Sequence, residues 1–343
     1  MRVIATVAVA LLTAHALGQV SEAPDPLFQD NTILGVTISG PLTTLVRERP
    51  KDDYLSGVFE YTDADGTEVE LDLEIRARGN FRHANCDYPP VLLNLKRGQT
   101  DGTLFDHQNK LKLVIQCDRS ERYEQGVLRE YLAYRILNAL TDKSFRVRLL
   151  SATYINLEDR NDNPPRYAFL IEHKNRLAER YELEDLKIER TSVDSLQADQ
   201  LNLTSVFEFL IGNTDFSPIA GAPGDECCHN YVLFGEGDNP LWAVPYDFDQ
   251  SGFVDAPYAE PNSQLDIRSV RQRLYRGRCV NNEHVATSLQ TFRDKKDDIV
   301  ALVDEQVGLK PYVRKQLIRY IDDFYHLIND PRDVERQITN RCI

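Results

Sequence analysis

Beyond its first residues the chain lacks any long apolar segment, and it also lacks low-complexity tracts and internal repeats. A helix that spans a bilayer needs about 20 mostly apolar residues, so the sequence predicts no integral membrane segment after the N-terminal region. The absence of biased tracts, with 42% hydrophobic and 27% charged residues, is typical of an ordinary globular protein. A length of 343 residues predicts one large domain or two lobes.

The chain also has too few basic residues to balance its acids, which leaves a formal net charge of −14. Such a surface repels phosphate backbones and anionic lipids, so we expect neither nucleic acid nor an anionic membrane as a partner. ATP is not excluded, because local lysines, arginines and a divalent metal can reverse the field within a site.

The N-terminal segment has the pattern of a secretory signal peptide. Arg2 precedes an uncharged apolar run of 11 residues, Val3 to Thr13, and small residues lead to a predicted cleavage site after Gly18. A buried strand or an uncleaved anchor is the alternative interpretation. We predict a signal peptide at 1–18, a flexible lead-in at 19–32, and a secreted or periplasmic protein. The short leader and a single N-x-T sequon at Asn202 favour a bacterial envelope.

All six cysteines follow the predicted cleavage site. An even number of cysteines in an exported chain predicts disulfides. Cys86 with Cys117 is the first expected pair, and Cys279 with Cys342 would tie down the end of the sequence. Many other pairings remain formally open.

Zinc binding is the alternative for the segment Cys227, Cys228 and His229. Adjacent cysteines are poorly spaced for a tetrahedral site, which usually has two to four residues between its ligands. We therefore favour disulfides here as well.

The first half of the chain has the alternating pattern of β-strands. Apolar and charged residues alternate over Val58–Tyr61 and Val69–Ile75, and Asp65-Gly66 between them is typical of a hairpin turn. One helix is expected at Val127–Leu140, where apolar residues recur every fourth position. Further strands are expected at 33–40, 90–95, 110–117, 147–157 and 167–172.

The second half is mainly helical. Helices are expected at 192–198, at 203–211 and through most of the last 60 residues, and a loop rich in Gly, Pro and Asp spans 212–229. The predicted fold class is α+β with two lobes and a cleft between them. The lobes would be a β-rich N-terminal lobe with one main helix at 33–172 and a mainly helical C-terminal lobe at 173–343.

Four side chains with oxygen ligands follow apolar segments of the second half. Asp247 and Asp249 come at the end of a hydrophobic strand, and Asn230 precedes another strand. Two carboxylates and an amide form the hard oxygen set that suits Mg²⁺ or Mn²⁺. Asp215, in a loop after a helix, is free to act as a base toward a substrate hydroxyl, and such a set suits phosphoryl transfer. Aspartate is also common in turns, so each residue alone has a structural interpretation.

Basic residues suited to phosphate lie in the first half. Lys110 and Lys112 share one face of a strand, and Glu130 on the expected helix would hold the lysine that is used. Arg78 precedes Gly79, where a tight turn can bring backbone N–H groups near phosphates, and neighbouring arginines add charge. The structural alternatives are an exposed strand with two ordinary lysines and an ordinary hairpin loop.

In these elements the chain resembles the spore coat CotH-like kinase family, a divergent branch of the protein-kinase-like fold. The matching segments run in order from Arg76 to Gly252, roughly half of the chain, and include R-x-R-G-N, K-L-K-L, G-N-T-D, H-N and P-Y-D-F-D. The sequence has no G-x-G-x-x-G loop, and Tyr246 stands where the family usually has tryptophan. The resemblance implies a two-lobed protein-kinase-like fold and a kinase that uses ATP with Mg²⁺ or Mn²⁺.

The resemblance also implies a role for each matching residue. Asp215 looks like the catalytic aspartate, and Asn230, Asp247 and Asp249 look like the metal ligands. The residues that it implies for the nucleotide are the lysine Lys112, or else Lys110, its partner Glu130, the loop residue Arg78, and Glu172 near the adenine.

The expected function is transfer of the ATP γ-phosphoryl group to Ser or Thr hydroxyls of secreted or envelope proteins. One alternative is nucleotidyl transfer or glutamylation, because one fold can host several chemistries. The other is a non-catalytic coat or envelope binding protein. The sequence does not indicate the oligomeric state.

Overall fold

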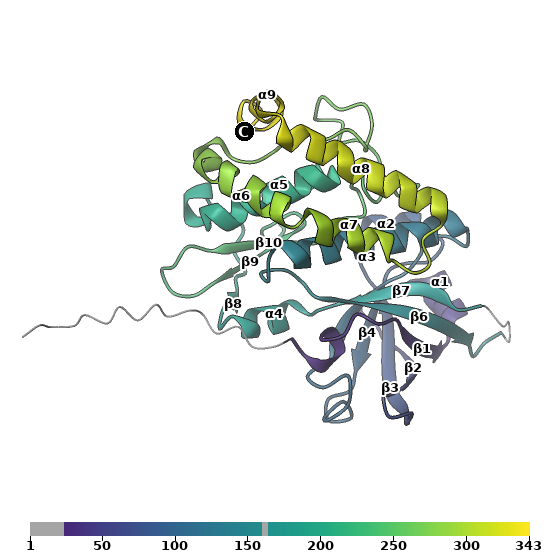
Figure 1. The fold of residues 1–343 in the computed structure, drawn as a ribbon. Helices are drawn as coiled ribbons and strands as arrows, with labels where there is room; N and C mark the ends of the chain where they lie inside the picture. Colours follow the sequence, from purple (N-terminus) through teal and green to yellow (C-terminus); the bar gives the residue numbers. More distant parts are fainter. Residues whose placement is uncertain (1–23, 160–163) are drawn as a thin grey trace, which may run out of the picture.

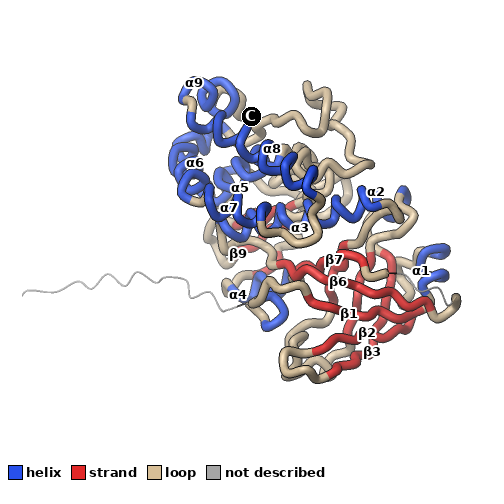
Figure 2. Tube along the Cα trace, turned by 45° about the vertical axis from the view of Figure 1, so that its right-hand side comes forward, coloured by secondary structure: helices blue, strands red, loops and turns tan. Residues whose placement is uncertain are grey.

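A computed structural model describes residues 24–159 and 164–343. The predicted signal peptide, residues 1–18, lies outside the described residues. Strands gather in the lower part of the molecule in Figure 1 and most helices gather above them, and the turned view of Figure 2 shows the same separation. None of the helices in the described ranges has the length and apolarity needed to cross a membrane.

Seven strands of the described chain close into a barrel in the order β1-β2-β3-β4-β5-β7-β6. Neighbouring strands are antiparallel except at the closure, where β1 and β6 run parallel with Leu34 opposite Leu150. The expected Asp65-Gly66 turn joins β2 to β3. The strands are β1 (Leu34–Gly40), β2 (Leu55–Thr62), β3 (Glu68–Ala77), β4 (Val91–Leu95), β5 (Lys110–Val114), β6 (Val147–Asn156) and β7 (Arg166–Ile171).

The closed barrel shows that the predicted fold class is wrong. An α+β fold with a two-lobed kinase-like arrangement would have an open sheet in its N-terminal lobe, whereas these strands form a closed mixed barrel. Their inward side chains, among them Val36, Leu73, Leu111 and Leu170, pack together as a separate core. Period-two alternation requires only that one strand face be buried. It does not indicate whether that face is covered by helices or by the barrel's own opposite wall.

The main helix α3 (Glu121–Leu140) lies outside the barrel and connects it to the other helices. It packs on β7 and on α7, within a large apolar core formed with the helical half. The other helices are α1 (Leu42–Glu48), α2 (Phe81–Asn85), α4 (Lys174–Arg180), α5 (Ala198–Ile211), α6 (Val285–Asp294), α7 (Lys296–Asp304), α8 (Pro311–Asn329) and α9 (Pro331–Val334).

Two helix predictions need correction. The segment 192–198 forms only a 3-10 turn at Val193–Ser195 before α5 begins at Ala198. The four short helices α1, α2, α4 and α9 span four to seven residues each and were not expected. Helices this short carry little periodic signal, because one or two turns do not define an apolar face.

A second, smaller sheet lies in the helical half, with the order β10-β9-β8. It contains β8 (Glu184–Asp185), β9 (Tyr231–Gly235) and β10 (Trp242–Pro245). Buried residues of β9 and β10 form a third core together with Leu196, Phe216 and the adjacent cysteines 227 and 228. This sheet carries the candidate site at one end.

The segment 24–32, part of the expected lead-in, makes specific contacts. Leu27 and Phe28 are buried with the barrel residues. Asp25 Oδ1 lies 2.7 Å from Arg176 Nη2 of α4, and its Oδ2 accepts a hydrogen bond from Gln108. These contacts fix the chain directly before β1.

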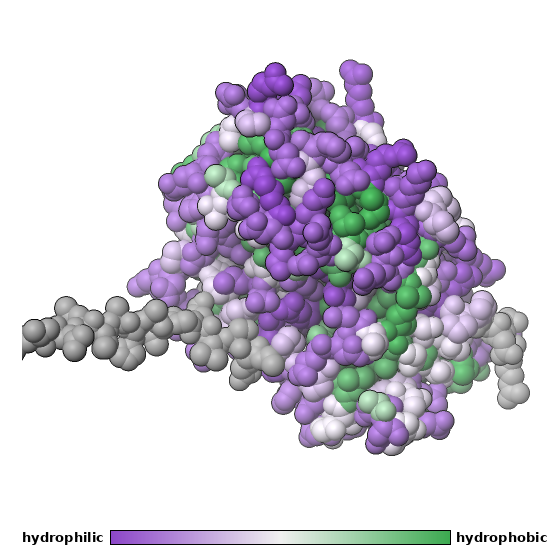
Figure 3. Space-filling model, viewed as in Figure 1, coloured by the Kyte–Doolittle hydropathy of each residue, from purple (hydrophilic) through white to green (hydrophobic). Residues whose placement is uncertain are grey.

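Three disulfides join all six cysteines in pairs. The expected pairs Cys86–Cys117 and Cys279–Cys342 are confirmed. The remaining pair links the neighbours Cys227 and Cys228. Disulfides are typical of proteins in an oxidising, extracellular-type environment. The face drawn in Figure 3 is largely hydrophilic, in keeping with the acidic composition.

Candidate functional site

Asn230 and Asp247 lie together because β9 and β10 form an antiparallel pair. Asn230 directly precedes β9 and Asp247 follows the end of β10, so both stand at the same end of the pair. The backbone N–H of Tyr246 donates to the Asn230 carbonyl over 3.0 Å. Asn230 has φ 55° and Asp247 has φ 65°. Asn and Asp tolerate this left-handed backbone better than other residues with side chains, which helps to explain their presence at both positions.

Asp215 joins this end of the sheet through its carboxylate. It follows α5, which ends at the left-handed Gly212, and its N–H donates to Asn213 Oδ1 over 3.0 Å. The His229 ring nitrogen Nε2 lies 2.7 Å from Asp215 Oδ1, and Asn230 Nδ2 donates to Asp215 Oδ2 over 3.1 Å. Both carboxylate oxygens are therefore oriented by the two residues that precede β9.

Helix α3 lies against the same group of residues. The Tyr134 hydroxyl accepts a 2.9 Å hydrogen bond from the Asp247 N–H, and its ring contacts Phe248 at 4.6 Å between centroids. Burial raises the pKa of Tyr134 well above its ordinary value, so the hydroxyl is neutral. This contact fixes the backbone that carries Asp247 to the helix that connects the barrel with the helical half.

Two cations face Asp247 from the barrel. Lys112 lies on the outer face of β5 with its Nζ 4.5 Å from the centroid of the Tyr246 ring. Arg78 directly follows β3 and donates from Nε to the Val91 carbonyl over 3.2 Å. Burial and then the Arg78 charge lower the pKa of Lys112 to about 8, while the Asp247 carboxylate acts in the opposite direction. Lys112 and Arg78 thus form a cationic side opposite the carboxylates.

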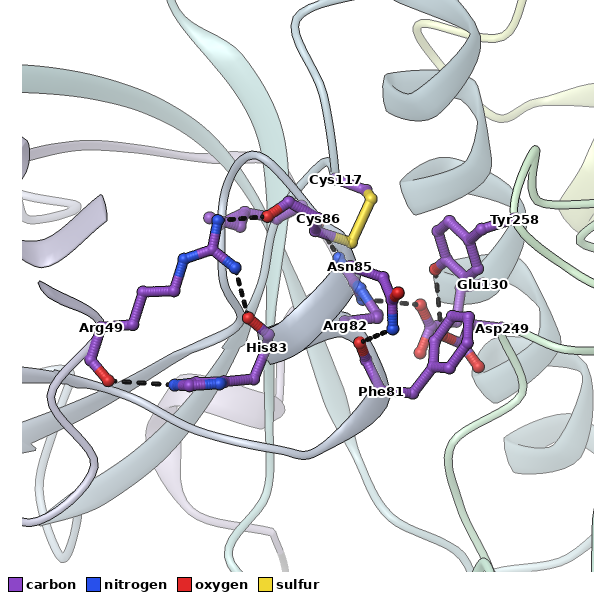
Figure 4. Close-up of a disulfide and its surroundings, with 11 residues drawn as sticks. Arg49, Phe81, Arg82, His83, Asn85, Cys86, Cys117, Glu130, Asp249 and Tyr258 are labelled. Carbon is purple, nitrogen blue, oxygen red and sulfur yellow. Dashed lines mark hydrogen bonds and ion pairs between the residues drawn. A yellow bond between two sulfur atoms is a disulfide. The ribbon is translucent and has the colours of Figure 1, made fainter. Parts of the chain in front are cut away.

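The carboxylate of Asp249 is buried and lies beside Tyr258 (Figure 4). Its Oδ2 accepts a 2.9 Å hydrogen bond from the Tyr258 hydroxyl, and the Arg82 guanidinium lies 5.8 Å from the centroid of the Tyr258 ring. Burial and then the Asp247 charge raise the pKa of Asp249 to about 7. Burial, followed by Asp249, also raises the pKa of Glu130. The charges of Asp247, Asp249 and Glu130 thus act on one another within the site.

Glu130 is paired differently from the prediction. Its Oε2 lies 4.0 Å from Arg82 Nη1, whereas an ion pair with Lys112 was expected. Arg82 belongs to α2, which the Cys86–Cys117 disulfide joins to the chain after β5. The sequence indicated Arg82 only as additional positive charge. It did not indicate that a buried arginine would reach the helix from the disulfide-linked loop.

Two other predicted residues lie apart from this group. Lys110 is exposed at the start of β5. Glu172 is 3% exposed, and its Oε1 lies 2.9 Å from Arg180 Nε. Its Oε2 accepts hydrogen bonds from Arg180 and from the Arg146 N–H, so both oxygens are already used within the protein.

His229 is the functional candidate that the sequence predictions omitted. The sequence assigned His229 a role only in the zinc alternative, apart from its place in the H-N segment, and that alternative fails because Cys227 and Cys228 are bonded to each other. The hydrogen bond that the His229 ring makes to the Asp215 carboxylate raises the pKa of His229, which favours the imidazolium form. Its position beside Asn230 in the sequence was the available signal. A disulfide between adjacent residues closes almost no loop of the unfolded chain, so Cys227–Cys228 constrains only the backbone of its own segment.

The donor set fits a divalent cation in its chemistry. Asp247 and Asp249 supply carboxylates, and the Asn230 nitrogen bonds Asp215, which leaves its Oδ1 as a further oxygen ligand. A cation here would offset the burial and the Asp247 charge, which together raise the pKa of Asp249. Across 24–159 and 164–343, however, no three His, Cys, Asp or Glu side chains are grouped as a metal site. The metal role of Asn230, Asp247 and Asp249 therefore stays a prediction.

A buried glutamate below the Asp215 loop predicts a pH-dependent stability. Glu208 of α5 is 1% exposed, and hydrogen bonding to Asn213 and Tyr231 does not offset the burial of its carboxylate. Burial raises its pKa to about 8, against 4.5 ordinarily. The folded protein keeps a proton that the unfolded chain releases, so the free energy of unfolding should fall between pH 4.5 and about 8. The total loss is roughly 5 kcal/mol.

The variant Glu208→Gln should lack this part of the pH dependence, because the amide stays neutral. Denaturant unfolding at several pH values with the disulfides intact measures the effect, and Glu236→Gln, at an exposed position, is the matched control. Parallel pH profiles for the wild type and Glu208→Gln would contradict a proton held at this position.

Comparison with known proteins adds no family to this geometry. No protein-family model matches the chain, and no curated protein matches it significantly. The functional argument therefore depends on the side chains described above.

Proposed function

We propose that the protein is a metal-dependent phosphotransferase that moves the γ-phosphoryl group of ATP to Ser or Thr hydroxyls of secreted or envelope proteins. One observation carries the proposal. Asp215, Asn230 and Asp247 come from separate segments to one end of the small sheet, and the carboxylate of Asp247 acts on Lys112 and Arg78 of the barrel. Phosphoryl transfer needs the cations, because the phosphate-bearing substrate is anionic, and it needs a carboxylate, because the acceptor hydroxyl must lose a proton.

The support comes from these side chains and from the sequence resemblance, and no longer from the fold. Membership of the CotH-like kinase family is part of the proposal. The disulfides agree with the proposed setting, since they indicate an oxidising compartment. Export by a cleaved signal peptide at 1–18 is likewise proposed from the sequence.

Asp215 would act as the base. Its side chain is 40% exposed, so an acceptor hydroxyl can reach it. As the hydroxyl oxygen bonds to the γ-phosphorus and the bond to the leaving ADP oxygen breaks, the hydroxyl proton would pass to the Asp215 carboxylate. Hydrogen bonds from His229 and Asn230 hold both carboxylate oxygens in place before the substrate arrives, which is the positioning that phosphoryl transfer requires.

Lys112 and Arg78 would bind the phosphates from the barrel side. Their burial strengthens electrostatic attraction to an anion, and a bound phosphate would raise the lowered pKa of Lys112. Asn230, Asp247 and Asp249 would hold a Mg²⁺ or Mn²⁺ ion. When bound, such an ion supplies charge neutralisation for the β- and γ-phosphates.

Labelled ATP separates the proposal from its alternatives. The purified protein, with its disulfides formed, is incubated with Mn²⁺ or Mg²⁺ and a Ser/Thr peptide mixture. The label is on the γ- or the α-phosphate of ATP, or on glutamate. Label transferred from the γ-phosphate alone, and lost with EDTA, is the expected result.

The other outcomes contradict the proposal in distinct ways. Label from the α-phosphate would indicate nucleotidyl transfer, and ATP-dependent incorporation of glutamate would indicate glutamylation. No incorporation by folded protein on any peptide or on the protein itself would favour a non-catalytic binding protein.

A further inference from the structure

The guanidinium of Arg276 holds the backbone on both sides of Asp215. Its Nη1 donates to the Thr214 carbonyl over 2.7 Å and to the Phe216 carbonyl over 2.9 Å. The same guanidinium lies 5.1 Å from the centroid of the Phe216 ring. Hydrogen bonds from a charged donor are stronger than neutral ones, and here a single nitrogen bridges residues 214 and 216.

Arg276 bonds carbonyls that His229 and Asn230 do not reach. Those two residues fix the Asp215 carboxylate, and Asn230 also donates to the Asp215 carbonyl, whereas Arg276 fixes the carbonyls before and after the residue. The loop after α5 has no strand ladder around residue 215 that would otherwise take up these carbonyls. The Asp215 charge also acts favourably on the partly buried Arg276.

The segment that carries Arg276 is itself held in place by residues 342 and 343. It is irregular, but the Ile343 N–H donates to the Gly277 carbonyl over 2.9 Å and the Cys279 N–H donates to the Ile343 carbonyl over 3.2 Å. The disulfide Cys279–Cys342 closes this pairing three residues after Arg276. An irregular segment loses conformational entropy when it is held in one arrangement, and a cross-link reduces that loss.

We propose that Arg276 is a positioning residue for the catalytic Asp215, and that the Cys279–Cys342 disulfide holds Arg276 in its position. The inference rests on the proposed phosphotransferase function for its kinetic consequences. Its structural part, the ordering of residues 212–218, stands independently. Arg276 does not touch the reacting groups and acts only through the carbonyls that flank Asp215.

The kinetic test compares Arg276→Ala and Arg276→Lys with the control Arg278→Ala. Arg278 belongs to the same segment and is partly buried, and its Nε has no hydrogen-bond partner among the described residues. We expect Arg276→Ala to lower kcat about 10- to 100-fold, because a displacement of about 1 Å at a catalytic group has an effect of this size. The KM for ATP should stay within about 2-fold, since Lys112 and Arg78 are untouched.

Two further results distinguish positioning from a general packing role. Arg276→Lys should recover only part of the activity, because an ammonium lacks the planar fork of donors. Added guanidinium ion at low millimolar concentration should raise the kcat of Arg276→Ala and leave Arg278→Ala unchanged. Equal losses of kcat in the Arg276 and Arg278 variants would overturn the assignment.

Amide hydrogen exchange tests the structural part without any activity. Exchange in the peptide covering 212–218 should be faster in Arg276→Ala and in the double variant Cys279→Ala, Cys342→Ala, and unchanged in Arg278→Ala. Unchanged exchange at 212–218, or faster exchange across the whole chain, would overturn the positioning role. If the wild type transfers no label, the proposed function fails, and this exchange measurement still decides the role of Arg276.

Discussion

The variant Asp215→Asn should lose turnover while it keeps nucleotide binding. Asparagine has nearly the same shape as aspartate, but its amide cannot take up the proton of the acceptor hydroxyl. Loss of a general base typically lowers the rate by about 10²- to 10⁴-fold. Asp215 lies beside Asn230 but faces the exposed side of the site, so the cationic residues Lys112 and Arg78 remain to bind ATP.

Transfer of γ-label under saturating ATP measures the turnover, and thermal stabilisation by ATP–Mn²⁺ measures binding in the same preparation. Asp225→Asn is the matched control, because Asp225 is an exposed carboxylate in the same loop. A variant that keeps more than about a tenth of the wild-type kcat would show that Asp215 is not the base, given the usual effect of removing one.

The local structure of the barrel was largely predictable from the sequence, but its closure was not. Alternation and the Asp65-Gly66 turn located β2, β3 and their hairpin. Closure depends on the parallel pairing of β1 with β6, where Leu34 meets Leu150 across more than a hundred residues. Alternation within each strand says which face is buried, and it does not specify which distant strand supplies the next hydrogen bonds.

The same limit applies to the candidate site. Asp215, Asn230, Asp247 and Asp249 lie in loops next to apolar segments, so their positions could be predicted from local pattern. Arg82 lies on the short helix α2 and Arg276 on an irregular segment, and each stands a few residues before a disulfide cysteine, Cys86 and Cys279. A lone arginine on a loop or a very short helix has no periodic or motif signal, because its partners lie on other segments.

Glu130 shows how a correct position can come with a wrong partner. The helix was expected at 127–140 and begins earlier, at Glu121, but it includes Glu130, which does face the site. Its cation comes from α2, a five-residue helix that no periodicity could have revealed. The half-buried Lys112 instead contacts the Tyr246 ring, and the carboxylate that acts on it is that of Asp247.

The second large effect concerns this residue: Asp247→Asn should abolish the stabilisation by ATP–Mn²⁺. Asp247 has φ 65°, a backbone that asparagine tolerates and alanine does not, so Asn removes the charge with little strain. Its carboxylate faces Asp249 and the two cations, where a divalent ion with the nucleotide would gain most. Binding at 100 times Kd stabilises a fold by about 2.7 kcal/mol, and the variant should lose nearly all of this.

The control for this variant is Asp255→Asn, because Asp255 also has a left-handed backbone but lies outside the candidate site. Asp255 has φ 50°, and its carboxylate lies 3.0 Å from Arg271 and 3.7 Å from Arg129. The control should keep the full shift with ATP–Mn²⁺, and neither protein should respond to ATP with EDTA. Because Asp247 opposes the effect of burial on Lys112, its loss should also lower the pKa of that lysine further. A full ATP–Mn²⁺ shift in Asp247→Asn would mean that the nucleotide and its metal bind elsewhere, and phosphoryl transfer at this site would have to be abandoned.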